Sequence, residues 1–215
     1  KRLDSLNKLI GREQLSPTTV KIVDIAGLVK GASKGEGLGN KFLSNIRETD
    51  AIIHVLRCFD DPNVVHVDGK INPLSDKEVV EYELVMKDIE IVDKRLDKVR
   101  KTLRSGGNEA KKEIEILERV KFSLESIKVN IGDFSEDEFK DFIKPLELIS
   151  FKPILYVCNV GESDVVDGND YVELVKKEVR DKSSDVIIIS AKIESEINEL
   201  DSLDEKQMFL DDWGL

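Results

Sequence analysis

Apolar and polar residues follow two different periods along the chain. Short apolar runs typical of strands occur at residues 20–26, 51–58, 152–158 and 185–189. Helical periods surround them at residues 3–10, 41–48, 168–180 and, in two short pieces, 193–210. The run at 51–58 is apolar on both faces, as strands of a covered parallel sheet are. Strands that alternate with helices in this way predict an α/β fold with a parallel sheet.

A longer helical pattern interrupts this alternation. From Tyr82 to Leu103, apolar residues alternate at spacings of three and four, which makes a heptad seam of about three heptads. The sequence SGGN at 105–108 breaks the seam, and an apolar stripe resumes from Ala110 to Ile127. Two helices joined by a short glycine turn fold back into an antiparallel hairpin. We therefore expect a sheet domain at 1–74 and 149–215, with a helical coiled-coil domain inserted at 75–148.

Composition narrows the class of protein. The chain has 215 residues and a formal net charge of −11, which argues against binding duplex DNA with its whole surface. A membrane span needs about 18 apolar residues, and no run approaches that length, so no membrane contact is expected. Cys58 and Cys158 each end an apolar run and are predicted to be reduced, buried thiols. These features predict a cytoplasmic protein.

Polar residues with possible chemistry follow three of the predicted strands. They are Asp24-Ile25-Ala26-Gly27, Asn159-Val160-Gly161-Glu162 and Ser190-Ala191-Lys192. Each alone is a weak signal, because an Asp-turn-Gly sequence has an ordinary loop explanation. Ligands of open α/β sheets bind at the carboxyl ends of the strands. In this order and at these places, the three motifs indicate a P-loop NTPase of the GTPase type.

That pattern assigns a candidate role to each motif. Asp24 would hold Mg²⁺ through a water, and the backbone N–H of Gly27 would sense the γ-phosphate. Glycines 31, 35, 37 and 39 would let the following segment change shape with nucleotide state. Asn159 and Glu162 would read the base, and the Ser190-Ala191-Lys192 loop would close over it.

A resemblance to a known family extends this interpretation. The stretch VDIAGLVKGASKGEGLGNKFLSNIRETDAI resembles the switch region of the YchF subfamily of Obg-like P-loop NTPases. The similarity continues through HVLRCFDD, HVDGKINPLSD, KPILYVCNV and ISAKIESEINELD, and it covers nearly the whole chain. It implies a G-domain-like fold with an inserted antiparallel coiled-coil hairpin. It also implies slow Mg²⁺-dependent nucleoside triphosphate hydrolysis by a ribosome-associated molecular switch.

The resemblance also implies two departures from ordinary GTPases. Leu28 stands where Ras-like proteins carry a catalytic Gln, and because leucine cannot orient water, another group must do so. His66, in a polar loop, is one candidate; the alternative is a solvated loop histidine, whereas His54 is expected in the core. The base-reading motif ends in Glu162, and Val160 stands where many GTPases have Lys. These two differences predict a preference for ATP over GTP.

Parts of the family pattern are missing from the chain. There is no G-x-x-x-x-G-K-[ST] sequence, so the phosphate cradle and its Lys are absent, and no switch I Thr is identifiable. The family's C-terminal TGS domain is absent as well. We therefore expect a fold that lacks its first strand and P-loop, in a chain truncated at both ends relative to the family. Alone, such a chain is expected to be weak or inactive, so the predicted function concerns the parent protein.

The predicted hairpin carries a basic end in an otherwise acidic chain. Between residues 94 and 112 there are eight Lys or Arg residues, opposed by Asp97 and Glu109. A charge run is usually a solvated helix face; the alternative is a contact with ribosomal RNA or another polyanion. The candidate contact residues are Lys94, Arg95, Lys98, Arg100, Lys101 and Arg104.

Two other functions compete with the nucleotide switch. One is a non-enzymatic interaction module, in which the sheet is a scaffold and the hairpin binds the ribosome or another partner. The other is a dinucleotide-binding Rossmann domain, to which Asp60 after a strand would contribute. The sequence GEGLGN does not fit that function, because its glycines have the wrong spacing and come several residues after the strand.

Overall fold

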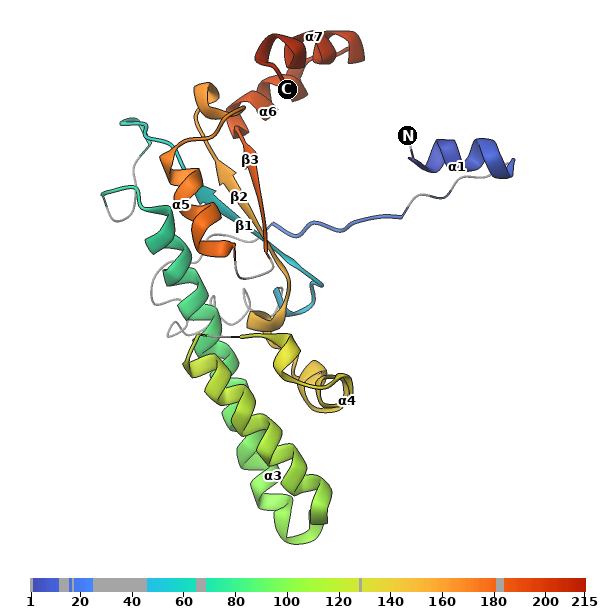
Figure 1. Cartoon of the computed structure of the whole chain (residues 1–215), viewed down its shortest axis with the longest axis vertical. Coiled ribbons are helices and arrows are strands. Elements are labelled where there is room, and N and C mark those ends of the chain that lie inside the picture. The colour runs from blue at the N-terminus through green and yellow to red at the C-terminus, as the bar shows by residue number, and fades with distance from the viewer. Residues whose placement is uncertain are drawn as a thin grey trace.

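The chain folds into a small parallel sheet from which a long helical hairpin projects (Figure 1). This computed structural model describes residues 2–11, 16, 18–24, 46–64, 69–127, 129–180 and 184–215. The strands are β1 (Ile52–Arg57), β2 (Ile154–Asn159) and β3 (Asp185–Ile189). The helices are α1 (Arg2–Ile10), α3 (Pro73–Glu125), α4 (Glu136–Glu138), α5 (Asp170–Val179), α6 (Ala191–Glu199) and α7 (Leu203–Trp213). Short helical turns are η2 (Ile131–Asp133), η3 (Phe139–Ile143), η4 (Lys144–Leu146), η5 (Ile149–Phe151) and η6 (Glu162–Asp164).

The described strands form one parallel sheet in the order β1-β2-β3. The register places Val55 opposite Val157, and Val157 opposite Ile187. The α/β prediction is therefore confirmed for the three strand runs at 51–58, 152–158 and 185–189. The helical periods at 3–10, 168–180 and 193–210 are confirmed as α1, α5 and the pair α6 and α7. Because β2 is central, the carboxyl ends of β1 and β3 flank its own.

The two faces of the sheet differ in their cover. On one face, Leu56, Tyr156 and Cys158 pack against α5 and the start of α3 in a buried apolar cluster. On the other face Ile53, Val55 and Ile187 remain 53%, 58% and 43% exposed. The sequence predicted cover on both faces; on this face the central Val157 is buried, whereas its neighbours on the two outer strands are exposed.

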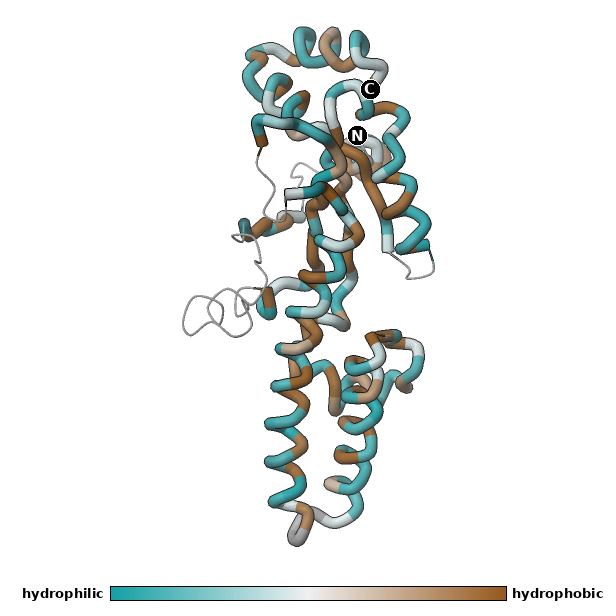
Figure 2. Tube along the Cα trace, turned by 90° about the vertical axis from the view of Figure 1, so that its left-hand side faces the viewer, coloured by the Kyte–Doolittle hydropathy of each residue, from teal (hydrophilic) through white to brown (hydrophobic). Residues whose placement is uncertain are grey.

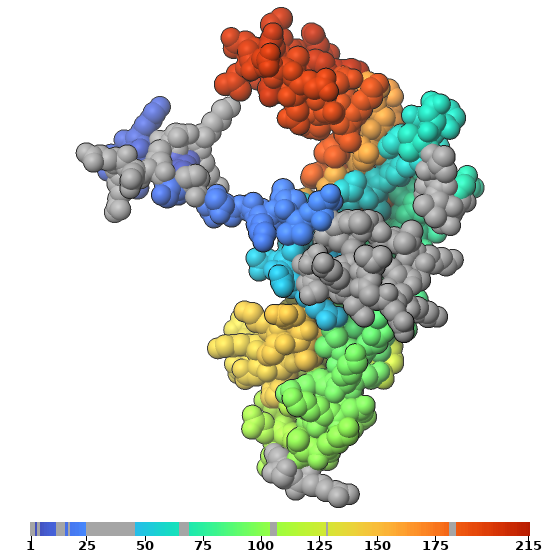
Figure 3. All heavy atoms as spheres, turned by 180° about the vertical axis from the view of Figure 1, so that it is seen from behind, coloured from blue at the N-terminus to red at the C-terminus, as the bar shows by residue number. Residues whose placement is uncertain are grey.

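The prediction of a strand at 20–26 is wrong for residues 20–24, the part of it that the structure describes. Residues 18–24 have no regular secondary structure, and Val20 and Ile22 are exposed. A strand is stabilised by backbone hydrogen bonds to a neighbour. Among the described residues, β1 is hydrogen-bonded to β2 alone, so its other edge offers no partner that joins this segment to the sheet. Helix α1 lies away from the rest of the molecule, and the segment runs from its side toward the body (Figure 3).

The predicted antiparallel hairpin is confirmed. Helix α3 reverses at Gly107, whose φ of 60° and ψ of −144° lie outside the helical region and suit glycine. Ion pairs join the two arms: Lys121 with Asp93 at 2.7 Å, and Arg95 with Glu113 at 2.6 Å. The seam between the arms buries Val92, Leu96, Val99, Ile116, Leu117, Val120 and Leu124. Hydrophobic and hydrophilic residues alternate along both arms (Figure 2).

A buried polar network fastens the first arm to the sheet. The Tyr156 hydroxyl, on β2, donates to Glu81 Oε1 at 2.6 Å, and Lys77 Nζ donates to Glu81 Oε2 at 2.9 Å. The Lys77 side chain is fully buried and also lies over the Tyr156 ring. His54 packs beside that ring at 5.7 Å, and burial lowers the pKa of its imidazole. His54 is half-buried, so the expectation that it belongs to the core is met in part.

A second anchor lies where the chain returns from the hairpin. The buried Asp88 carboxylate accepts hydrogen bonds from the backbone N–H of Ile149 at 3.0 Å and of Ser150 at 2.7 Å. Both N–H groups belong to the start of η5, which leads into β2. Asp88 therefore fixes the end of the hairpin region against the first arm.

Local capping follows the sequence closely. Ser135 and Glu138 form a capping box at the start of α4, in the order that this motif has in sequence. Of the helix predicted at 41–48, residues 46–47 are helical and 41–45 lie outside the described residues. Lys152 Nζ donates to the carbonyls of Ile46, Arg47 and Thr49 and so holds that helix end beside the sheet.

Across the described ranges, no helix combines the length and apolar character needed to cross a membrane.

Candidate nucleotide-binding site

The second and third polar motifs meet at the carboxyl edge of the sheet. Asn159 is the last residue of β2, and Ser190 follows β3 directly. Because the register pairs Asn159 with Ile189, the two loops leave the sheet side by side. The backbone N–H of Ala191 donates to Asn159 Oδ1 at 2.9 Å. Residues 32 positions apart in the sequence thus share one hydrogen bond at this edge.

An ion pair links the ends of the same two motifs. Lys192 Nζ, at the start of α6, lies 2.8 Å from Glu162 Oε2, at the start of η6. The Lys192 side chain is 65% exposed and the Glu162 side chain 35% exposed. The hydrogen bond to Glu162 raises the pKa of Lys192. The pair therefore presents a charged donor and a charged acceptor together at the rim of the site.

Two other members of the motifs are buried. The Val160 side chain packs in the apolar cluster under the sheet, and its backbone N–H donates to Ile189 O at 2.8 Å. Ser190 is 1% exposed, and its Oγ has no hydrogen-bond partner among the described residues. A buried hydroxyl without a partner is costly, and a bound ligand or a water relieves that cost. The site therefore fits a polar ligand at the loop that Ser190 begins.

Arg57 is a residue of this edge that sequence reasoning missed. Its guanidinium donates to the carbonyls of Phe59 at 3.2 Å, Asp61 at 3.2 Å and Val64 at 3.0 Å. It thereby organises the loop that follows β1. The signal in the sequence was a charged residue inside an otherwise apolar strand run. The loop continues toward the candidate His66, which lies outside the described residues.

Asn169 was also missed, although it connects three parts of the site. Its Nδ2 donates to Cys58 O and to Asp164 Oδ2, both at 2.8 Å. Its Oδ1 accepts from Val172 N at 3.2 Å and so caps α5. An Asn directly before a helical period is an N-cap signal. That capping residue also ties the end of β1 to the turn that carries Glu162.

Among the described residues, Asp24 is not brought to this edge. Asp24 is exposed in the segment outside the sheet, so its expected place at the tip of a buried strand is not observed. Gly27 and Leu28 lie outside the described residues. Within the described ranges no group of three or more His, Cys, Asp or Glu side chains could hold a metal ion. One carboxylate nevertheless suits Mg²⁺, which binds to one or two carboxylates together with waters and substrate phosphates.

The candidate partner-binding residues of the hairpin divide into two groups. Arg95 is engaged by Glu113, and Arg100 by Glu118 at 2.9 Å. Lys94, Lys98 and Lys101 are exposed, and none of them is in an ion pair with another described residue. The side chain of Arg104 lies outside what the structure describes. Among the described candidates, the three lysines, rather than Arg95 and Arg100, are thus the cations left for an external anion.

Comparison with known proteins identifies the family. Residues 6–95 match the profile of a family described as 50S ribosome-binding GTPase. The ribosome-binding ATPase YchF of Bacillus subtilis (strain 168) is 46% identical over 217 residues, which cover 100% of this chain and 59% of that protein. Its counterpart in Escherichia coli O157:H7 is 42% identical over 215 residues, covering 100% and 58%. The chain belongs to the YchF family.

A solved structure agrees with this assignment. The Schizosaccharomyces pombe YchF GTPase matches with a TM-score of 0.82 and 34% identity, over 99% of this chain and 58% of that one. The chain thus spans somewhat under three fifths of the length of its YchF relatives.

The two cysteines of this YchF chain are buried and free, as predicted. The neighbouring Cys158 thiol and burial raise the pKa of the Cys58 thiol, which disfavours its reactive thiolate.

Proposed function

We propose that the protein containing this YchF-family chain is a cytoplasmic, ribosome-associated switch. It binds ATP in preference to GTP and slowly hydrolyses it with Mg²⁺. The observation that carries the proposal is the convergence of Asn159, Glu162, Ala191 and Lys192 at one edge of a parallel sheet. The names of its relatives, ribosome-binding ATPases, agree with it.

The proposal gives each described residue a definite task. The Asn159 side chain, held by the Ala191 N–H, presents its amide to the base. The loop that begins at Ser190 closes over the base, and the buried Ser190 hydroxyl gains a partner when the site is filled. Arg57 and Asn169 are positioning residues, because they hold the loops that carry the site.

The phosphate end of the site would draw on Asp24, which is exposed outside the sheet, and on segments outside the described residues. Asp24 would hold Mg²⁺ together with phosphate oxygens, and the Gly27 N–H would sense the γ-phosphate. His66 is the candidate for orienting the attacking water, since Leu28 cannot. The chain carries no phosphate cradle of its own, so we propose that nucleotide turnover requires the longer protein.

Replacing Asn159 with alanine in the longer protein is expected to weaken ATP binding about tenfold, because the base loses its amide partner and the Ala191 N–H loses its acceptor. Competition against a fluorescent ATP analogue measures this. Asn198→Ala is the matched control, since Asn198 is exposed on α6 in the same region of the chain. Equal ATP affinities for Asn159→Ala and the parent would refute the assignment of this edge.

The second candidate function is an interaction module, and the exposed lysines of the hairpin favour it. In that case the hairpin binds ribosomal RNA, and the sheet is a scaffold. The two functions are compatible in the longer protein, where nucleotide would regulate ribosome binding. An experiment on this chain alone distinguishes the two functions, because the interaction module predicts that the chain binds ribosomes in the absence of nucleotide.

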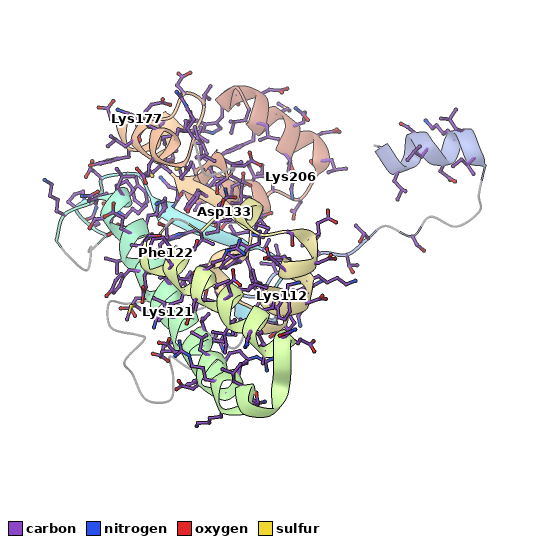
Figure 4. All side chains as sticks on the ribbon, turned by 60° about the horizontal axis from the view of Figure 1, so that its bottom comes forward. Lys112, Lys121, Phe122, Asp133, Lys177 and Lys206 are labelled. Carbon is purple, nitrogen blue, oxygen red and sulfur yellow. The ribbon has the colours of Figure 1, made fainter. Side chains whose placement is uncertain are left out.

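Charge reversal at Lys98 and Lys101 is expected to weaken ribosome binding about tenfold near physiological salt. The slope of log affinity against log salt should fall by about two, one for each lost phosphate contact. Co-sedimentation with ribosomes at several salt concentrations measures both quantities. The control reverses Lys177 on α5 and Lys206 on α7, two lysines borne by other helices (Figure 4). Similar losses in the control pair would mean that net charge, not the hairpin, determines binding.

A further inference from the structure

The ion pair between Lys192 and Glu162 occupies the groups that would distinguish one purine from another. The two residues come from separate loops, after β3 and after β2, and meet at 2.8 Å beside Asn159. The backbone N–H of Ala191, the neighbouring donor, is already engaged by Asn159 Oδ1 at 2.9 Å. Both the carboxylate and the nearest backbone donor of the base-reading edge are therefore engaged within the protein.

Guanine and adenine make different demands on such an edge. Guanine presents two donors, its N1–H and its 2-amino group, next to the O6 acceptor. A carboxylate satisfies both donors, and an N–H group satisfies O6. Adenine has no 2-amino group, its N1 is an acceptor, and its 6-amino group is a donor. A site that lacks a free carboxylate leaves guanine donors unpaired, which is costly, whereas adenine has no such requirement.

We propose that Lys192 is a specificity-determining residue that excludes guanine by holding the Glu162 carboxylate in an ion pair. The inference rests on the proposed nucleotide function and identifies what sets its preference for ATP. The ammonium group acts in two ways. It occupies a carboxylate oxygen that guanine would need, and it places a positive charge beside the N–H donors of guanine. Because the pair is largely exposed to water, its strength depends on salt.

The test compares affinities for GTP and ATP in the longer protein that contains this chain. Lys192→Met keeps the aliphatic stem, which can still cover a base, and removes the ammonium group. The ratio of the GTP to the ATP dissociation constant is expected to fall about tenfold, mainly because GTP binds more tightly. Lys192→Arg keeps a cation and is expected to retain the parental ratio. Both constants come from competition of unlabelled nucleotides against a fluorescent ADP.

A salt titration separates this role from a merely structural one. In the parent, raising salt from low to about 0.5 M screens the exposed pair and should lower the GTP to ATP ratio. In Lys192→Met the ratio should stay constant over the same range. Lys177→Met, an exposed lysine of α5, controls for the loss of one charge and should behave as the parent.

The alternative outcomes separate this inference from the proposed function. An unchanged ratio in Lys192→Met, with ATP binding retained, overturns the role of Lys192 and leaves the nucleotide function standing. Equal weakening of both nucleotides also overturns it, because Lys192 would then only stack or support the loop. If the parent protein binds neither nucleotide, the proposed function fails, and this inference fails with it. Should Lys192→Met be unstable, Lys192→Gln carries the same expectation.

Discussion

Replacing Glu81 with leucine is expected to lower the free energy of unfolding by about 3–5 kcal/mol. Glu81 is the shared acceptor of Lys77 Nζ, at 2.9 Å, and of the Tyr156 hydroxyl, at 2.6 Å. Without it, the buried Lys77 ammonium keeps only Glu178 as a carboxylate partner, at 3.8 Å, among the described residues. The Tyr156 hydroxyl would lose its acceptor in the same step. Removing one member of a buried ion pair is costly because the remaining charge is left uncompensated.

Urea denaturation measures this effect as a shift of the midpoint at constant slope. Glu78→Leu is the matched control, since Glu78 is exposed on the same helix and its change should cost less than about 0.5 kcal/mol. The double variant Lys77→Met with Glu81→Leu should recover much of the loss, because no charge then remains unpaired. A double variant as unstable as Glu81→Leu alone would show that packing, not charge, carries the effect.

Replacing Asp88 with alanine is expected to cost about 2–4 kcal/mol. The carboxylate is fully buried and accepts the backbone N–H groups of Ile149 and Ser150. Alanine leaves both donors without an acceptor, and an unpaired buried donor costs about 1–2 kcal/mol. The exposed Asp97, about two and a half turns along the same helix, supplies the control Asp97→Ala. Comparable losses in the two variants would contradict an anchoring role for Asp88.

The cost of Asp88→Ala should depend on pH with a defined sign. Burial raises the pKa of the Asp88 carboxyl, against the two backbone hydrogen bonds that lower it. The folded state therefore holds this proton more tightly than the unfolded state. That stabilisation is complete below the unfolded pKa, about 3.9, and is lost as pH rises through the folded pKa. The difference between parent and variant should thus shrink from about pH 4 upward. Growth of that difference with pH would mean that the hydrogen bonds outweigh burial.

Both anchors connect the hairpin to the sheet that carries the candidate nucleotide site. Glu81 and Asp88 lie on the first arm of α3, whereas Tyr156 and η5 belong to β2 and its approach. Hydrogen bonds therefore join the arm to the strand that ends at Asn159. Such a connection is what a protein needs if nucleotide at one end is to influence ribosome binding at the hairpin.

Sequence patterns predicted those elements that have a short-range signal, namely an apolar period or a turn. Apolar runs located β1, β2 and β3. The heptad seam and the glycines near 107 predicted the hairpin, because seam and turn each have a short-range signal. The convergence of Asn159, Glu162 and Ser190-Ala191-Lys192 followed from the rule that parallel strands end at one edge.

Only the tertiary structure decided the contacts between residues far apart in the sequence. The run at 20–26 has the composition of a strand, but residues 18–24 form none, because a strand requires a neighbour that no local pattern reveals. The Glu81–Tyr156 and Asp88–Ile149 bonds join residues 75 and 61 positions apart, and the Lys192–Glu162 pair spans 30. Sequence by itself thus determined the elements and the edge where the candidate chemistry gathers. Which charges are paired at that edge, and what fastens it to the hairpin, depends on three-dimensional proximity.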